Sequence, residues 1–174
     1  MNNNILRKIL LLITPFLLLG IIACSNNDAQ NQFERDARTA AKGYTHTDNQ
    51  GKIVQGEKDP DDWRIGPMFQ GYVEIMYPPY PNPVTTNQRL TIQLTVTGLE
   101  SVYGLNIYVR TYNPQPRLIY QDSSSPLPTG LTTIKLDPLQ LSPTGNPDDA
   151  RGLHRIFIYD DNDNLITYGD IMVQ

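Results

Sequence analysis

From Trp63 to the last residue, apolar and polar side chains alternate with a period of two. The clearest run starts at residue 90 and has four apolar residues on one face and four polar residues on the other: Leu90, Ile92, Leu94 and Val96 against Thr91, Gln93, Thr95 and Thr97. Successive side chains of a strand point to opposite faces of a sheet. This pattern therefore predicts strands that bury one face.

A second run places Leu105, Ile107 and Val109 inward and Asn106, Tyr108 and Arg110 outward. We expect about seven strands in total, over residues 72–76, 90–96, 105–110, 117–121, 131–136, 154–159 and 165–173. Turn residues separate these runs, and no convincing helical period interrupts them. The pattern predicts an all-β fold, an immunoglobulin-like antiparallel β-sandwich over residues 63–174.

Proline is concentrated just before the clearest strand, at positions 78, 79, 81 and 83. Proline cannot donate a ladder hydrogen bond, so this stretch is predicted to be a sheet edge or a crossing loop. Its sequence Tyr80-Pro81-Asn82-Pro83 resembles the opening of small C-terminal β-sandwich modules, among them sorting domains of type nine secretion cargo and flagellar hook-cap modules. The resemblance continues through Leu127–Gly130, Asp137–Leu139 and Gly152, although residues 153–155 lack the expected aromatic. It implies a sandwich over residues 80–174 and, more weakly, a sorting signal.

The first 24 residues have the order of an export signal. Arg7 and Lys8 precede an apolar run over residues 9–23, and Cys24 follows. The run is roughly 15 residues long, whereas a membrane-spanning helix needs about 20 apolar residues. The segment is therefore predicted to direct export and not to remain as a span.

The end of this segment, Ile21-Ile22-Ala23-Cys24, resembles the lipobox of bacterial lipoproteins. The resemblance implies cleavage before Cys24, lipidation of its thiol and a location in the cell envelope. The residues after the cysteine are Ser25 and Asn26, and neither is the aspartate that is linked to inner-membrane retention in some bacteria. This favours the outer membrane. The alternative is an ordinary secretory signal with a chance cysteine. Cys24 is the only cysteine, so no intramolecular disulfide can form.

Residues 24–62 are rich in Asn, Gln, Asp and Lys and poor in large apolar residues, which predicts a polar tether. A short helix near Phe33–Ala41 is possible but expected to fray. Without residues 1–23 the formal net charge goes from −4 to −6, because Arg7 and Lys8 are lost. No basic run follows Cys24, so nucleic acid is not an expected partner.

Two acidic groups are candidate ligand sites. Asp160–Asn164 could offer oxygen ligands to calcium, but the sixth and twelfth positions of an EF-hand loop would fall on Leu165 and Ile171. The main interpretation is a hairpin turn, with a loose calcium site as the alternative. Asp59, Asp61 and Asp62 are interpreted as a solvated boundary beside Trp63, which would cap the core.

The sequence contains few residues of the types that usually carry out catalysis. Its two histidines, His46 and His154, are predicted in the tether and in a strand. A catalytic triad or a multi-histidine metal site is therefore not expected, nor is a nucleotide fingerprint. The prediction names no catalytic, cofactor-binding or metal-binding residue and no cofactor. The strand tyrosines at positions 72, 108, 112, 120, 159 and 168 could instead line a sugar-binding face.

These observations predict a non-enzymatic lipoprotein, anchored to a membrane by lipid on Cys24, that acts as a binding or envelope-assembly module with an unidentified protein partner in the envelope. One alternative is a carbohydrate-binding or adhesion module, suggested by the tyrosines and the acidic loop. A second alternative is a secretion-associated sorting module, suggested by Tyr80–Pro83.

Overall fold

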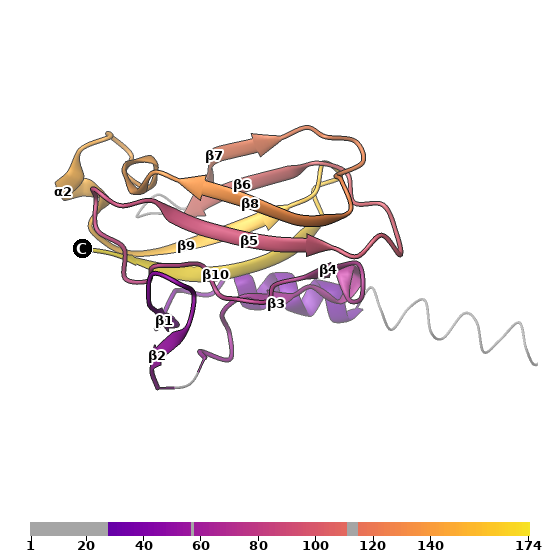
Figure 1. Cartoon of the computed structure of the whole chain (residues 1–174), viewed down its shortest axis with the longest axis horizontal. Coiled ribbons are helices and arrows are strands. Elements are labelled where there is room, and N and C mark those ends of the chain that lie inside the picture. Colours follow the sequence, from indigo (N-terminus) through magenta and orange to yellow (C-terminus); the bar gives the residue numbers. More distant parts are fainter. Residues whose placement is uncertain (1–27, 57, 111–114) are drawn as a thin grey trace, which may run out of the picture.

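The computed structural model describes residues 28–56, 58–110 and 115–174, and these form an all-β sandwich (Figure 1). One sheet has five strands in the order β3 (Arg64–Ile65), β10 (Leu165–Val173), β9 (Gly152–Tyr159), β6 (Leu105–Arg110) and β7 (Arg117–Asp122). The other has three, in the order β4 (Val73–Glu74), β5 (Leu90–Val96) and β8 (Gly130–Leu136). Neighbouring strands in both sheets are antiparallel. The predicted fold class is confirmed.

All seven expected strands are present as β4 to β10. In β5 every second residue is buried, as the alternation predicted. Smaller elements complete the described chain: β1 (His46–Thr47), β2 (Ile53–Gln55), η1 (Pro67–Phe69), η2 (Pro138–Leu141) and α2 (Pro147–Ala150). The structure adds the strands β1, β2 and β3, which are too short to show a period.

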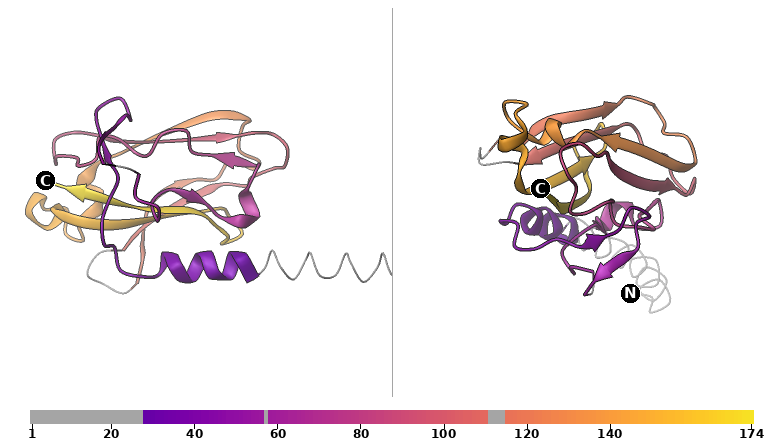
Figure 2. Two further views of the ribbon diagram at one scale, coloured as in Figure 1. Left: turned by 90° about the horizontal axis from the view of Figure 1, so that it is seen from below. Right: turned by 60° about the vertical axis from the view of Figure 1, so that its left-hand side comes forward.

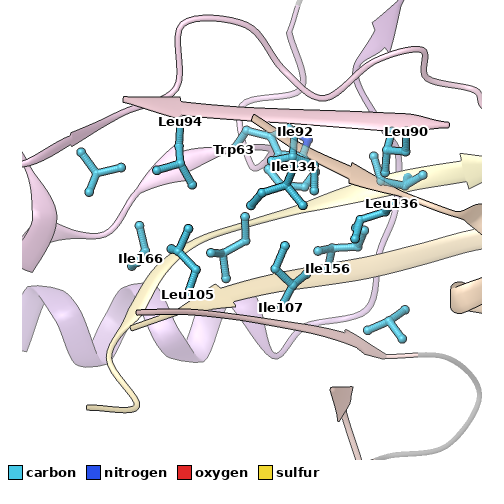
Figure 3. Packing of buried hydrophobic residues seen from close by; sticks show 14 of the residues in the cluster. Trp63, Leu90, Ile92, Leu94, Leu105, Ile107, Ile134, Leu136, Ile156 and Ile166 are labelled. Carbon is cyan, nitrogen blue, oxygen red and sulfur yellow. The ribbon is translucent and has the colours of Figure 1, made fainter. Parts of the chain in front are cut away.

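The main core lies between the two sheets. Figure 3 shows Leu90, Ile92 and Leu94 of β5 directed toward Leu105 and Ile107 of β6. Each of these five side chains is at most 1% exposed. Burying such side chains contributes roughly 1.5–3 kcal/mol apiece, so this cluster is the main source of the sandwich's stability.

Trp63 belongs to this core and is 2% exposed. Its ring packs on the backbone of Gly169 in β10, where a Cβ atom would lie only 2.3 Å from the ring. Gly169 is therefore required at this position for space. The prediction that Trp63 caps the core is confirmed.

The N-terminal segment differs from the predicted tether. Residues 28–37 form a helix that lies alongside the sandwich (Figure 2). Phe33 and Ala37 are 5% and 1% exposed and pack with Phe157 and Tyr168 on the outer face of the five-stranded sheet. The described part of residues 28–62 is thus part of the folded domain, and the helix is fixed by packing.

Polar residues of this segment are buried because the sandwich offers them hydrogen-bond partners. The Gln30 side chain donates to the carbonyl of Leu165 at 3.1 Å, and the Thr47 hydroxyl donates to the carbonyl of Pro79 at 2.8 Å. A buried polar group that is hydrogen-bonded avoids most of the cost of losing water. Composition alone therefore cannot distinguish such a segment from a tether.

The proline-rich stretch is a crossing loop, as predicted. The Tyr80 amide and carbonyl pair with Thr91 of β5, and the Val84 amide donates to Met172 of β10. Between them Asn82 is 1% exposed and donates from its side chain to the carbonyls of Thr45 and Asp170, each at 3.0 Å. The loop therefore joins the two sheets to the N-terminal segment.

Candidate functional site

A buried ion pair fixes the outer face of the five-stranded sheet. Arg155 of β9 donates from Nε and Nη2 to the two carboxylate oxygens of Asp170 in β10, at 2.7 and 2.6 Å. Both side chains are at most 4% exposed. Nη1 of Arg155 donates to the carbonyls of Ala37 and Thr39, at 3.2 and 2.9 Å. This arginine therefore ties the end of the N-terminal helix to the sheet.

Asp62 extends this polar network. Its carboxylate accepts hydrogen bonds from the Thr45 amide at 2.7 Å and from the Asp170 amide at 2.9 Å. Burial raises the pKa of Asp62 to about 7, more than these hydrogen bonds lower it, and the nearby Asp170 raises it further. Its partners are all groups of the domain itself, so this network supports the fold.

The N-terminal helix covers β9 and β10 but leaves part of the outer face of β6 accessible. Tyr108 of β6 and Tyr159 of β9 meet there edge to face, with ring centroids 5.6 Å apart. Together with Pro116 and Asp163 they line a cavity of about 180 Å³, the tyrosine cavity. Burial raises the pKa of Tyr159, so its phenol stays protonated and can donate a hydrogen bond.

A second cavity, of about 340 Å³, lies where β6 and β9 approach the residues after the helix. This arginine cavity is lined by Arg38, Ala40, Ala41, Arg110, Leu153 and Arg155. Nη1 of Arg110 donates to the carbonyl of Arg38 at 2.7 Å, and its Nη2 donates to the carbonyl of Thr39. The guanidinium carbon of Arg110 also lies 5.6 Å from the centre of the Phe157 ring.

The two cavities share one strand face. Tyr108 and Arg110 are two residues apart on β6, so their side chains project from the same side of the sheet. Across the strand pair, Tyr108 is opposite Phe157 and Arg110 is opposite Arg155. A surface with aromatic rings, a carboxylate and several guanidinium groups can bind a polar ligand that also has apolar faces.

The acidic stretch at 160–164 forms the predicted hairpin turn between β9 and β10. Asp160 Oδ1 accepts hydrogen bonds from the amides of Asn162 and Asn164, at 3.0 and 2.8 Å. Asp160 Oδ2 accepts from the side-chain amides of the same two residues. The Asp160 carboxylate therefore serves the turn itself.

The three residues of the other acidic group, Asp59, Asp61 and Asp62, differ in burial. The predicted solvated boundary is wrong for Asp62, which is 1% exposed. Asp61 is exposed, and its carboxylate lies 3.7 Å from the Arg64 guanidinium. The Asp59 carboxylate accepts a hydrogen bond from the Asp61 amide at 2.9 Å. Among the described residues, no group of three or more His, Cys, Asp and Glu is arranged to hold a metal ion.

The remaining candidate residues do not form a site. His154 is buried in β9, where burial lowers its pKa and its Nε2 lies 2.7 Å from the Ala150 carbonyl. His46 is half-buried and stacks on Tyr44. The other tyrosines considered as a sugar-binding face are dispersed: Tyr72 and Tyr120 pack against the main core, and Tyr168 lies under the helix.

Cys24, the signal over residues 1–23 and Tyr112 lie outside the described residues. In the described part of the chain, no helix has both the length and the apolar character needed to cross a membrane. The lipid anchor at Cys24 stays a prediction.

The arginine cavity is the feature that the sequence did not predict. Arg38, Arg110 and Arg155 are widely separated along the chain and form no basic run. The alternation correctly placed Arg110 on the outer face of its strand, next to Tyr108. Only the docking of the N-terminal segment, which the sequence did not predict, brings Arg38 to the same place.

No protein-family model and no curated protein matches this sequence. Among solved structures, the chain is similar to a polysaccharide monooxygenase CBM33, with 18% identity and a TM-score of 0.38 over 59% of this chain and 64% of that one. It is similar to AA10A of T. fusca, with 17% identity and a TM-score of 0.35 over 52% and 51%. A β-glucosidase of Kluyveromyces marxianus shares 14% identity, with a TM-score of 0.39 over 59% of this chain and 14% of its own.

The chain therefore spans at most 64% of the length of these solved chains. The likeness concerns the strand arrangement alone. It corrects one prediction, that the protein is not an enzyme. These similar structures include a polysaccharide monooxygenase and a β-glucosidase, which are enzymes. A shortage of histidines in the sequence is not a sufficient ground for excluding catalysis.

Proposed function

We propose that this protein is a lipid-anchored protein of the bacterial cell envelope whose β-sandwich binds carbohydrate through the outer face of β6. The observation that carries the proposal is the tyrosine cavity, in which the rings of Tyr108 and Tyr159 meet beside the Asp163 carboxylate. Sugar rings have apolar C–H faces that pack on aromatic rings, and hydroxyl groups that donate to carboxylates. Small-ligand sites typically combine aromatic walls with a small number of polar groups that point into the cavity.

The proposal for this chain depends on its own residues. Tyr108 and Tyr159 are half-buried. They are held in place by packing against the cluster of Phe33, Ala37, Phe157, Leu165 and Tyr168. Rigid aromatic side chains lose little conformational entropy when a ligand binds.

Replacing Tyr108 or Tyr159 by alanine is expected to weaken glycan binding about tenfold or more, since tyrosines in such positions often dominate binding energy. The measurement is retention of the full-length protein, solubilised in detergent, on a panel of immobilised neutral and acidic polysaccharides. Tyr108→Phe keeps the ring and should retain most of the affinity. Tyr77→Ala is the matched control, because Tyr77 is 46% exposed and follows β4 on the other sheet. Equal binding by all four variants would exclude this face as the site.

The membrane attachment of the proposed protein is through Cys24. The lipobox resemblance of Ile21–Cys24 and the preceding apolar run support it, and two or more acyl chains make attachment stable. We expect Cys24→Ser to abolish labelling by a palmitate analogue in the producing bacterium and to prevent recovery of mature protein with the outer-membrane fraction. Labelling of the Cys24→Ser variant at the wild-type level would contradict the anchor.

A further inference from the structure

The arginine cavity brings together three arginines, of which Arg38 and Arg110 have no ion pair among the described residues. Its three arginines face one space of about 340 Å³ in a chain whose net charge is −4. Arg155 has a counter-ion in Asp170, but no ion pair among the described residues joins Arg38 or Arg110 to a carboxylate. The cavity is therefore electropositive on the surface of an acidic protein, and it attracts anions.

The position of Arg110 is fixed by neutral groups. Its guanidinium donates to the backbone carbonyls of Arg38 and Thr39 and lies over the Phe157 ring. These contacts orient the side chain without cancelling its charge. Burial is the main cause that lowers the pKa of Arg110, and the nearby Arg155 lowers it further, whereas Asp170 and Tyr159 raise it. An anion bound beside Arg110 would stabilise its charged form.

We infer that the arginine cavity binds the anionic group of an acidic sugar residue, in a glycan whose neighbouring ring occupies the tyrosine cavity. The inference rests on the proposed function and adds the class of glycan. Tyr108 and Arg110 are two strand positions apart, about 6.6 Å, so one short oligosaccharide can contact both. The planar guanidinium forms paired hydrogen bonds with anionic oxygens.

Both carboxylate and sulfate groups on sugars have this chemistry. The experiment therefore compares a polyuronate with its carboxyl-reduced form, and a sulfated galactan with its desulfated form, using detergent-solubilised full-length protein and biolayer interferometry. We expect one acidic glycan to bind about tenfold more tightly than its neutral counterpart. The pair that shows this difference identifies the anionic group. The preference should fall as salt is added, because the interaction is electrostatic.

Two variants assign the preference to the cavity. Arg110→Gln should reduce the preference for the acidic glycan to about twofold or less, and Arg38→Gln should also reduce it. The Arg38 side chain is exposed, and its guanidinium donates no hydrogen bond among the described contacts, so its replacement should leave the fold intact. Arg89→Gln removes the same charge from an arginine whose side chain is 63% exposed at the start of β5, and it should leave the preference unchanged. Arg155 is kept because its ion pair supports the fold.

Three other outcomes overturn the inference. Equal binding of acidic and neutral forms overturns it but leaves the proposed function intact. A preference for the acidic form that Arg89→Gln reduces as much as Arg110→Gln and Arg38→Gln overturns it in favour of a general charge effect. Absence of binding to every glycan overturns both the inference and the proposed function.

Discussion

Replacing Asp170 by alanine is expected to lower the free energy of unfolding by about 3–5 kcal/mol, because Arg155 would stay buried without its counter-ion. The pair is bidentate and almost completely buried. The backbone groups of residue 170, which contact Asp62 and Asn82, stay available in the alanine variant. Urea-induced unfolding followed by tryptophan fluorescence measures the effect, since Trp63 is in the core.

The matched control is Asp148→Ala. Its partner Arg151 lies 3.7 Å away, and the two side chains are 87% and 59% exposed. Exposed ion pairs contribute at most about 1 kcal/mol, so this variant should unfold close to the wild-type midpoint. If both variants unfold at the same urea concentration, the Arg155–Asp170 pair does not support the fold as described.

Trp63→Ala should destabilise the sandwich by a comparable amount, about 3–5 kcal/mol, because it leaves a large cavity in the main core. The ring is 2% exposed and packs directly on the Gly169 backbone. The effect is measured as a fall in the melting temperature by circular dichroism.

Trp63→Phe is the control for this prediction. It retains much of the apolar area and removes the indole Nε1, which is buried without a hydrogen-bond partner among the described residues. Its cost should therefore be clearly smaller than that of alanine. Equal destabilisation by the two changes would contradict the assignment of Trp63 to a packed apolar core.

The strands could be predicted because their pattern is local. Alternation of apolar and polar residues in β5 and β6 reflects one face that points into the core and one outer face that is more accessible. Strand β3 has only two residues, Arg64–Ile65, and pairs with the distant β10, so no local period marks it. Its position depends on tertiary contacts.

The candidate site could be predicted only in part. Tyr108 and Arg110 were placed outward by their strand period, and Tyr108 and Tyr159 were both named as sugar-binding candidates. The register that sets Arg110 opposite Arg155 is a property of the assembled sheet. The helix at 28–37, one boundary of this surface, docks through Phe33 and Ala37 in a segment whose composition is otherwise polar.

The most direct test of carbohydrate binding at the outer face of β6 is hydrogen–deuterium exchange of the full-length protein in detergent, with and without the tightest-binding glycan of the panel. We expect slower exchange in peptides that cover residues 105–110, 153–159 and 34–41, which border the two cavities. Peptides from β5 and β8 should exchange at unchanged rates. Protection confined to the three-stranded sheet would show that the glycan does not bind at the outer face of β6.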